Sequence, residues 1–385
     1  MALTRRRFVE SLGVAGASMV GGVTPAAAFV SAARAGAATP QSTTTATTTA
    51  ASLIKLDQNE NPNPPGPRVA KAVMDALVQG HRYPRNSADL ADAIATRHRV
   101  ARENVLLAAG SGELLRSTVL AFVDAKRPLV AGLPTFETST NTAKGLGLPV
   151  REIPVDGSLR LDLKAMEAAS IGAGLLFFCN PNNPTGTTWP ASDVEAMLDR
   201  LAKSSPDTTI LVDEAYAHFV DIPDYRTMAA RAANDPRVLV TRTFSKVFGL
   251  AGMRIGYAIG HKDTIAALRL RTTSGLLPTA SIAAALAVLN DEGLIQAQVQ
   301  ANKVNRATAT RVFQDLGFKV FPSDANFILV DVKRKAEDFQ AACRAQGVAV
   351  GRPFPGLATH SRISIGTADE MQRAAAVFKA VLAKV

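Results

Sequence analysis

The chain has 385 residues, which is enough for two domains with cores of their own. It carries 43 Lys and Arg against 33 Asp and Glu, a net charge of +10, of which the first 38 residues hold +3. Because the remaining positive charge is spread along the chain without a basic block, the composition argues against a nucleic-acid-binding protein and favours an enzyme with anionic ligands. Cys179 and Cys343 are the only cysteines, and no metal-ligand cluster or disulfide framework is visible.

The N-terminal segment is typical of a targeting sequence. Thr4-Arg5-Arg6-Arg7-Phe8-Val9 resembles a twin-arginine export signal, and an apolar region of small residues follows from Leu12 to Val30. We therefore predict a signal peptide over residues 1–38, a Thr-rich linker over 39–52, and a periplasmic or extracellular location. Gly, Ala and Pro25 interrupt the apolar region, so we expect no permanent membrane span; an uncleaved anchor is the alternative.

Residues 53–84 are expected to form an arm. The dense Pro and Asn content from Leu56 to Pro62 argues against a regular element there, and Val69–Val78 reads as a short amphipathic helix. Tyr83 follows in an extended turn. Its ring either packs against other side chains of the protein, or its phenol reaches a ligand.

From residue 85 to about 272, strands alternate with helices, which predicts an α/β domain with a mostly parallel sheet. A strand at Val105–Ala109 turns through Gly110-Ser111-Gly112-Glu113 into the helix Leu114–Phe122. Small residues at a helix N-terminus expose N–H groups to an anion, although a tight turn is the simpler explanation.

Further polar or aromatic residues follow other predicted strands. Phe136 comes after the strand Leu129–Ala131, where its ring could stack on a planar ligand or belong to the core. The strand Leu175–Cys179 precedes the loop Asn180-Pro181-Asn182-Asn183-Pro184-Thr185-Gly186. Asp213 ends the strand Thr209–Val212, and a carboxylate there can hold a pyridinium N–H. Open α/β sheets bind ligands at these carboxyl ends.

Lys246 comes shortly after the predicted strand Val238–Val240. A lysine amine attacks an aldehyde once it is neutral, and burial beside a cation such as Arg254 favours the neutral form. Hydroxyls at Thr243 and Ser245 could bind a phosphate, and glycines at 249, 252 and 256 are expected to let the backbone turn tightly around Lys246. Together these groups suit an aldehyde cofactor that carries a phosphate, which is pyridoxal 5′-phosphate.

Residues 273–385 have a different pattern and predict a smaller α+β domain. Ala283–Phe313 reads as a long helix with a break near Asn290-Asp291. After it we expect strands at Phe318–Val320, Phe327–Val332 and Ile363–Ile365. Helices are expected at Ala336–Gln346 and Glu370–Lys384.

From about Leu56 to the C-terminus, these motifs resemble the class I/II aminotransferases of fold type I, in the histidinol-phosphate aminotransferase branch. The resemblance rests on the 180–186 loop, Asp213-Glu214-Ala215-Tyr216, Ser245-Lys246 with Arg254, and, for the branch, Leu56–Pro62 and Arg82-Tyr83-Pro84. It implies a homodimeric enzyme that transfers an amino group between an amino acid and an oxo acid. The Pro-rich step at Pro62–Pro67 and the export signal depart from the branch, so the chemistry is better defined than the substrate.

The resemblance also implies roles for single residues. Lys246 would hold the cofactor covalently and move the substrate proton, Asp213 would pair with the ring nitrogen, and Tyr216 with Asn183 would bind the ring oxygen. Phe136 would stack on the ring, and the backbone of Ser111 and Gly112, with Ser245 and Arg254, would hold the phosphate. Glu113 would be a further cofactor-binding residue. Substrate contacts would come from Asn59, Arg352, Arg362 and, across the dimer, Tyr83.

Other functions use the same residues. A transaminase of different specificity, including one for aromatic substrates, shares all of them, and a fold type I decarboxylase or β-lyase shares the lysine, the aspartate and the phosphate site. A non-catalytic binding protein of the cell envelope is the alternative from another class. Loss of Lys246 or Asp213 would have favoured this alternative, but both residues are present.

Overall fold

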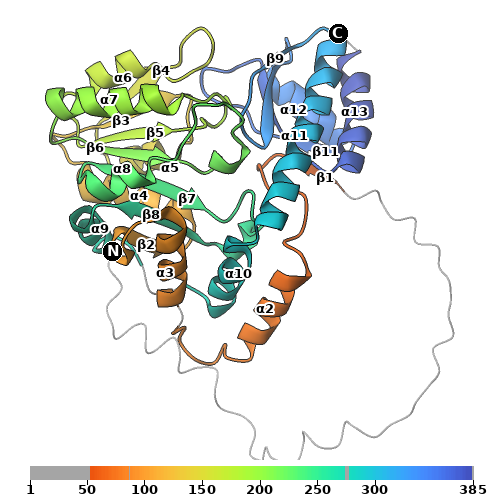
Figure 1. The fold of residues 1–385 in the computed structure, drawn as a ribbon. Coiled ribbons are helices and arrows are strands. Elements are labelled where there is room, and N and C mark those ends of the chain that lie inside the picture. Colours follow the sequence, from red (N-terminus) through yellow and green to blue (C-terminus); the bar gives the residue numbers. More distant parts are fainter. Residues whose placement is uncertain (1–52, 86, 274–276, 384–385) are drawn as a thin grey trace, which may run out of the picture. The chain divides into compact units, whose positions relative to one another are not determined.

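A seven-stranded sheet organises the larger part of the computed structural model, which describes residues 53–85, 87–273 and 277–383 (Figure 1). All neighbouring strands are parallel except β8, which runs antiparallel to both of its neighbours. This confirms the predicted α/β fold with a mostly parallel sheet. The strand order is β2 (Val105–Ala108), β8 (Gly256–Gly260), β7 (Val238–Thr243), β6 (Thr209–Asp213), β5 (Leu175–Cys179), β3 (Leu129–Leu133) and β4 (Val150–Pro154).

Helices cover both faces of this sheet, so its central strands are buried on both sides. Leu176 and Phe178 belong to one core, and Leu175 and Phe177 to the other. Such strands are continuous apolar runs, which made them recognisable in the sequence. On one face lie α4 (Ser111–Phe122), α5 (Thr138–Gly145) and α9 (Lys262–Arg269); on the other lie α3 (Ser87–His98), α6 (Leu163–Ala169), α7 (Ala191–Ser204), α8 (Ala229–Asn234) and α10 (Thr279–Leu289).

The C-terminal part has its own sheet and core, as expected for a smaller α+β domain. Its antiparallel strands are ordered β12 (His360–Ser364), β10 (Phe327–Asp331) and β9 (Lys319–Phe321). Phe313, Phe339 and Phe378 contribute fully buried rings to its core. The helices around it are α11 (Glu292–Asp315), α12 (Ala336–Ala345) and α13 (Ala368–Leu382).

The arm joins both parts of the molecule. It begins with β1 (Ile54–Leu56), which pairs in parallel with β11 (Val348–Val350), and continues to α2 (Pro67–Leu77), which packs on α10 (Figure 1). We expected an irregular segment from Leu56 onward, but Leu56 still belongs to a strand. A strand of three residues is too short to show a pattern in the sequence. The short 3₁₀ helices are Arg102–Asn104, Ala217–Phe219 and Ala251–Met253.

The Ala-rich helix agrees with expectation, whereas the segment at Gly256 differs from it. The Ala-rich helix does break at Asn290-Asp291 into α10 and α11, and the Asp291 carboxylate accepts from the N–H of Leu294, 3.0 Å away, as the N-cap of α11. Gly256, expected to ease a turn, instead begins the unpredicted strand β8. A Cβ on it would lie 2.6 Å from the Ser111 nitrogen, so close packing requires glycine there.

The predicted signal peptide and Thr-rich linker lie outside the described residues. Among the helices that the structure describes, none is both long and apolar enough to cross a membrane.

Candidate active site

The carboxyl ends of several strands of the large sheet open into one cavity of about 770 Å³. A crevice in this position and of this size is the usual ligand site of an open α/β sheet. Most of the residues singled out in the sequence line it: Asn59, Ser111, Gly112, Phe136, Asn183, Asp213, Tyr216, Ser245, Lys246, Arg254, Arg352 and Arg362.

Lys246 lies three residues beyond the end of β7, with its amine enclosed by the cavity. Its Nζ donates to the carbonyl of Asn59 at 3.0 Å. Burial, then the positive charge of Arg362, lowers the pKa of Lys246 to about 8. We expected Arg254 to be the neighbouring cation, but its effect is smaller than that of Arg362. The shifted pKa makes a neutral, nucleophilic amine accessible near neutral pH.

Asp213 is the last residue of β6 and is 2% exposed. Burial raises its pKa to about 6, while a hydrogen bond from the Thr241 hydroxyl, at 3.1 Å, opposes the rise. A buried carboxylate of this kind is stabilised in its charged form by a cationic partner, such as a protonated ring nitrogen.

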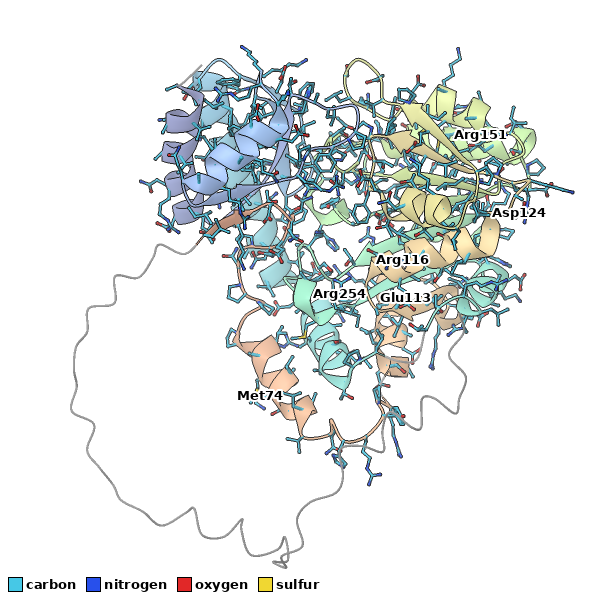
Figure 2. The ribbon with its side chains drawn as sticks, turned by 180° about the vertical axis from the view of Figure 1, so that it is seen from behind. Met74, Glu113, Arg116, Asp124, Arg151 and Arg254 are labelled. Carbon is cyan, nitrogen blue, oxygen red and sulfur yellow. The ribbon has the colours of Figure 1, made fainter. Side chains whose placement is uncertain are left out.

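An anion site is built around the start of α4. Gly110 has a φ of +83°, and a Cβ on it would lie 2.4 Å from Nη2 of Arg254, so the guanidinium rests where a side chain would be. Ser111 and Gly112, in the first turn of the helix, line the cavity together with Ser245. A helix N-terminus with an arginine and hydroxyls suits a phosphate group. Arg116, which we did not predict, also lines the cavity from α4 (Figure 2).

Glu113 and Tyr83 do not line the cavity. The Glu113 carboxylate accepts from the backbone N–H groups of Ala109, at 2.7 Å, and Thr273, at 2.6 Å. Burial opposes the change, but hydrogen bonds from Thr273 and Ala109 lower the pKa of Glu113. Glu113 therefore fixes the turn that carries the anion site. Tyr83 is 88% exposed, near the end of the arm.

Arg362, from β12, reaches the cavity from the smaller part. Its Nη1 donates to Oδ1 of Asn183 and its Nη2 to the carbonyl of Asp57, each at 2.7 Å. Its Nε is buried with no hydrogen-bond partner, and burial lowers the pKa of the side chain to about 10. A buried guanidinium with spare hydrogen-bonding capacity suits a carboxylate or phosphate.

Asn59 connects the arm to both parts. It has a φ of +54°, its N–H donates to Oγ of Ser364 at 2.7 Å, and its Nδ2 donates to the Tyr216 hydroxyl at 3.1 Å. Burial raises the pKa of Tyr216. Ser364 was missed in the sequence because it lies 305 residues from Asn59 and no local pattern marks it.

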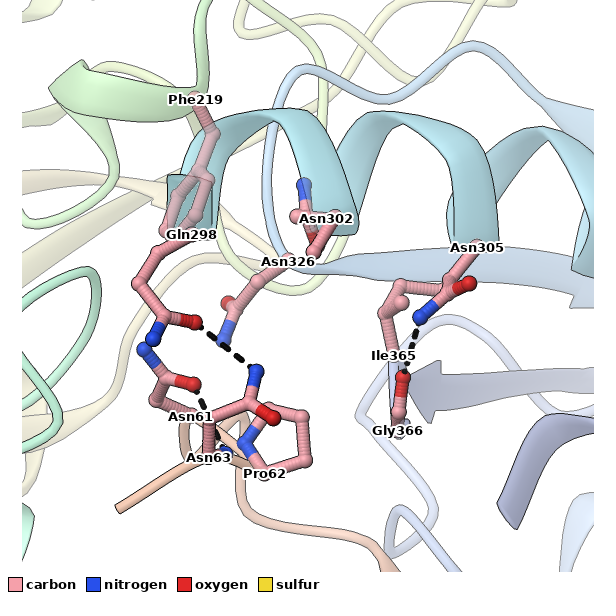
Figure 3. A pocket seen from close by; sticks show the side chains of 11 residues that line it. Asn61, Pro62, Asn63, Phe219, Gln298, Asn302, Asn305, Asn326, Ile365 and Gly366 are labelled. Carbon is pink, nitrogen blue, oxygen red and sulfur yellow. Dashed lines mark hydrogen bonds between the residues drawn. The ribbon is translucent and has the colours of Figure 1, made fainter. Parts of the chain in front are cut away.

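A much smaller cavity behind the arm is lined by amide side chains (Figure 3). It has about 20 Å³ of space, room for about one water molecule, which excludes a substrate. Asn63 Nδ2 donates to Oε1 of Gln298 at 2.8 Å, and Asn326 Nδ2 donates to the carbonyl of Asn59 at 2.9 Å. The amides thus tether the arm segment that lines the large cavity to α11 and to the start of β10.

The loop 180–186 is held by its own side chains. Asn182 accepts from the Thr135 hydroxyl at 2.7 Å and donates to the carbonyl of Pro134 at 3.1 Å. Asn180 donates to the carbonyl of Trp189 at 3.1 Å. Asn180 and Asn182 are fixed in this way, and Asn183 is the asparagine of this loop that lines the cavity.

Known proteins match the chain over most of its length. The family model described as "Aminotransferase class I and II" matches residues 51–378. The histidinol-phosphate aminotransferase of Symbiobacterium thermophilum is 36% identical and covers 86% of this chain and 91% of that relative. The one from Halalkalibacterium halodurans is 34% identical, over 86% and 90%.

Solved structures agree in fold. A putative histidinol-phosphate aminotransferase from Erwinia carotovora atroseptica superposes with a TM-score of 0.82 at 32% identity, covering 86% of this chain and 96% of the other. Histidinol-phosphate aminotransferase from Sinorhizobium meliloti, in complex with pyridoxal-5′-phosphate, superposes with a TM-score of 0.80 at 28% identity, covering 86% and 90%. The chain belongs to the aminotransferase class I and II family, in the branch of the histidinol-phosphate aminotransferases.

Proposed function

We propose that this aminotransferase uses pyridoxal 5′-phosphate to move an amino group between an amino-acid donor, such as glutamate, and a 2-oxo acid or imidazole-acetol-phosphate-like acceptor. The observation that carries the proposal is the convergence in one cavity of a lysine of lowered pKa, a buried carboxylate and the Arg254 anion site. The Sinorhizobium meliloti relative, in complex with the same cofactor, supports the choice.

The residues present fit this cofactor. Its ring and aldehyde supply an electron sink for the negative charge left when the substrate loses its Cα proton. Lys246 Nζ holds and returns that proton, and Asp213 keeps its negative charge beside the cavity. Arg362 binds the anionic group of the substrate and, with it, orients the Cα–H bond. Phe136, which follows β3 and lines the cavity, would offer its ring for stacking on the ring of the cofactor.

Spectroscopy of the half-reactions tests this function. Glutamate should convert the purified protein from its visible absorbance to that of the amine form of the cofactor, and a 2-oxo acid should restore it. A decarboxylase or β-lyase would not complete this cycle. Borohydride should then fix the cofactor on the peptide that contains Lys246, and labelling at another lysine would contradict the assignment.

We also propose a homodimer in which Tyr83 serves the site of the partner subunit. Support comes from a group of apolar side chains on and after α2 that are strongly exposed in the single chain: Met74, Leu77, Val78 and Tyr83. Exposed apolar clusters of this kind mark interaction surfaces. Light scattering should give twice the chain mass, and replacing Met74 and Leu77 together by Lys should yield monomers.

Export is proposed on the N-terminal motif alone. Replacing Arg5 and Arg6 together by Lys should leave active enzyme in the cytoplasm, whereas the unchanged protein is exported. Equal amounts of both proteins outside the cytoplasmic membrane would contradict a twin-arginine signal.

A further inference from the structure

Two arginines lie at the end of the large cavity that the smaller part forms. Arg362 comes from β12, and Arg352 follows β11. The ring of Phe354 lies close to both guanidinium groups, with its centroid 5.0 Å from Cζ of Arg362 and 4.5 Å from Cζ of Arg352. If neither arginine were paired with a carboxylate, both could bind a substrate group that carries two negative charges.

Arg352, however, is paired with Glu137. Both of its terminal nitrogens donate to the Glu137 carboxylate, one of them to Oε1 at 3.4 Å. Glu137 is the N-cap residue of α5, yet its side chain makes no capping hydrogen bond and is directed to Arg352 instead. Its neighbours Phe136 and Thr138 both line the cavity. Glu137 itself does not line the cavity, but Arg352 does, so the pair connects the start of α5 to the smaller part at the edge of the cavity.

Loss of this pair should leave the fold intact. The side chains of Arg352 and Glu137 are 52% and 25% exposed, and ion pairs with such access to water contribute little to stability. The two charges also act on the buried arginine, because Arg352 lowers and Glu137 raises the pKa of Arg362. A charge change at Glu137 is thus felt where the substrate anion is expected.

We infer that Glu137 determines specificity by occupying Arg352 and so weakening the site for substrates that carry a phosphate. The inference rests on the proposed function, since it places the substrate anion at Arg362. A phosphate monoester carries about −1.5 to −2 charges near pH 7 and gains from two arginines. At this end of the cavity it meets Arg362 together with an Arg352 that is already paired with a carboxylate. A ligand that lacks the phosphate is neither attracted by the arginines through that group nor repelled by the Glu137 carboxylate.

Histidinol phosphate and histidinol form a matched pair of probes, because they differ only in the phosphate. Their dissociation constants can be measured by calorimetry on protein treated with borohydride, in which no half-reaction takes place. Glu137→Gln should bind histidinol phosphate about three- to tenfold more tightly than the unchanged protein, from a lost repulsion and a freed arginine. Binding of histidinol should change less than about twofold.

Glu152→Gln is the control. Glu152 is paired with Lys144 at 2.8 Å, with side-chain exposures of 28% and 52%, close to those of the Glu137 pair. Neither residue of this pair lines the cavity, whereas Arg352 does. This variant should change neither affinity. In Arg352→Gln protein, the further change Glu137→Gln frees no arginine, so any gain that it produces measures the lost repulsion alone.

Unchanged or weaker binding of histidinol phosphate by Glu137→Gln overturns the inference, as does an equal gain for histidinol. Transamination is measured separately on untreated protein. If the enzyme transaminates but Glu137→Gln shows no gain, only the role of Glu137 fails. If the gain appears in a protein that does not transaminate, the proposed function fails and the role of Glu137 stands.

Discussion

Burial shifts the pKa of three charged groups in the cavity toward their neutral forms. Lys246 has a pKa of about 8, Asp213 of about 6 and Arg362 of about 10. For each group burial is the largest cause, because water stabilises the charged form better than the protein does. Ligand groups of opposite charge would restore that stabilisation, which is why these three residues are suited to binding rather than only to folding.

The pKa of Lys246 predicts how fast the apoprotein captures the cofactor at different pH values. Lowering the pKa from 10.5 to about 8 increases the neutral fraction at pH 7 by about 300-fold. The rate of pyridoxal phosphate attachment should therefore rise with pH and reach half its maximum near pH 8. Absorbance in stopped flow would show it. In Arg362→Gln the midpoint should move upward, because the main neighbouring cation is lost; a wild-type rate that still rises steeply at pH 10 would contradict the shift.

Asp213→Asn should leave the protein folded but slow the reaction by about 100- to 1000-fold. The amide keeps the shape of the side chain but removes the charge that stabilises the developing transition state, an effect comparable to the loss of other preorganised electrostatic groups. Single-turnover rates with glutamate measure the loss, and circular dichroism checks the fold. Near-native turnover would show that Asp213 is not the partner of the ring nitrogen.

Glu214, next to Asp213, has a structural role. It is 2% exposed and receives two hydrogen bonds from Arg242, at 2.9 and 2.8 Å, and one from the backbone N–H of Met228, at 2.7 Å. Adjacent carboxylates therefore differ in function because Glu214 is satisfied by protein groups while Asp213 faces the cavity.

The start of α4 shows how an element creates a binding site. The chain leaves β2, turns at Gly110 and enters the helix at Ser111, one residue after a backbone conformation that side chains rarely adopt. The absence of a Cβ at Gly110 gives Arg254 its place beside the helix N-terminus.

Gly110→Ala should therefore weaken binding of pyridoxal phosphate by about 10- to 100-fold, the equivalent of a lost charge-assisted hydrogen bond. Gly147→Ala is a matched control, because Gly147 has a φ of +69° but nothing within 4 Å of its Cβ position. Both variants should lose about 1–2 kcal/mol of stability from backbone strain. Cofactor titration and thermal unfolding separate the two effects; equal cofactor affinities would show that Arg254 does not depend on Gly110.

The arm ties the smaller part of the molecule to the site. β1 pairs with β11, the carbonyl of Asp57 accepts from Arg362, and Asn59 binds both Ser364 and Tyr216. The segment that lines the cavity is thus held from both ends, and its position depends on the whole folded unit.

A chain that begins at Leu53 should fold and bind the cofactor like the full protein, with a similar unfolding temperature, because all the described cores are present. A chain that begins at Gln58 loses Ile54 and Leu56, which are 7% and 0% exposed. Burial of two such side chains contributes about 3–6 kcal/mol. Thermal unfolding of both truncated proteins tests this, and equal midpoints would mean that β1 adds nothing.

Local patterns determined the fold class and the chemistry of this protein. Leu175–Cys179 was predicted with its bounds correct because it is buried on both faces, and Lys246 and Asp213 were found because each follows or ends such a strand. Strands that lack a continuous apolar run, such as β1, β8 and β11, were missed. They have three to five residues, and they either contain glycines or are too short to show an alternation of apolar and polar side chains. Their pairing partners lie far along the chain.

The sequence by itself determined which groups are present: a lysine, a carboxylate, an anion site and two arginines in an aminotransferase frame. Only the tertiary structure decided their environment. It placed Arg362, rather than Arg254, as the cation with the greater effect on Lys246, turned Glu113 into a support for the 110–113 turn, and paired Arg352 with Glu137. The physical reason is that pKa shifts and ion pairs depend on distances and burial across the fold, between residues as far apart as 215 positions in the chain, and no local pattern encodes them.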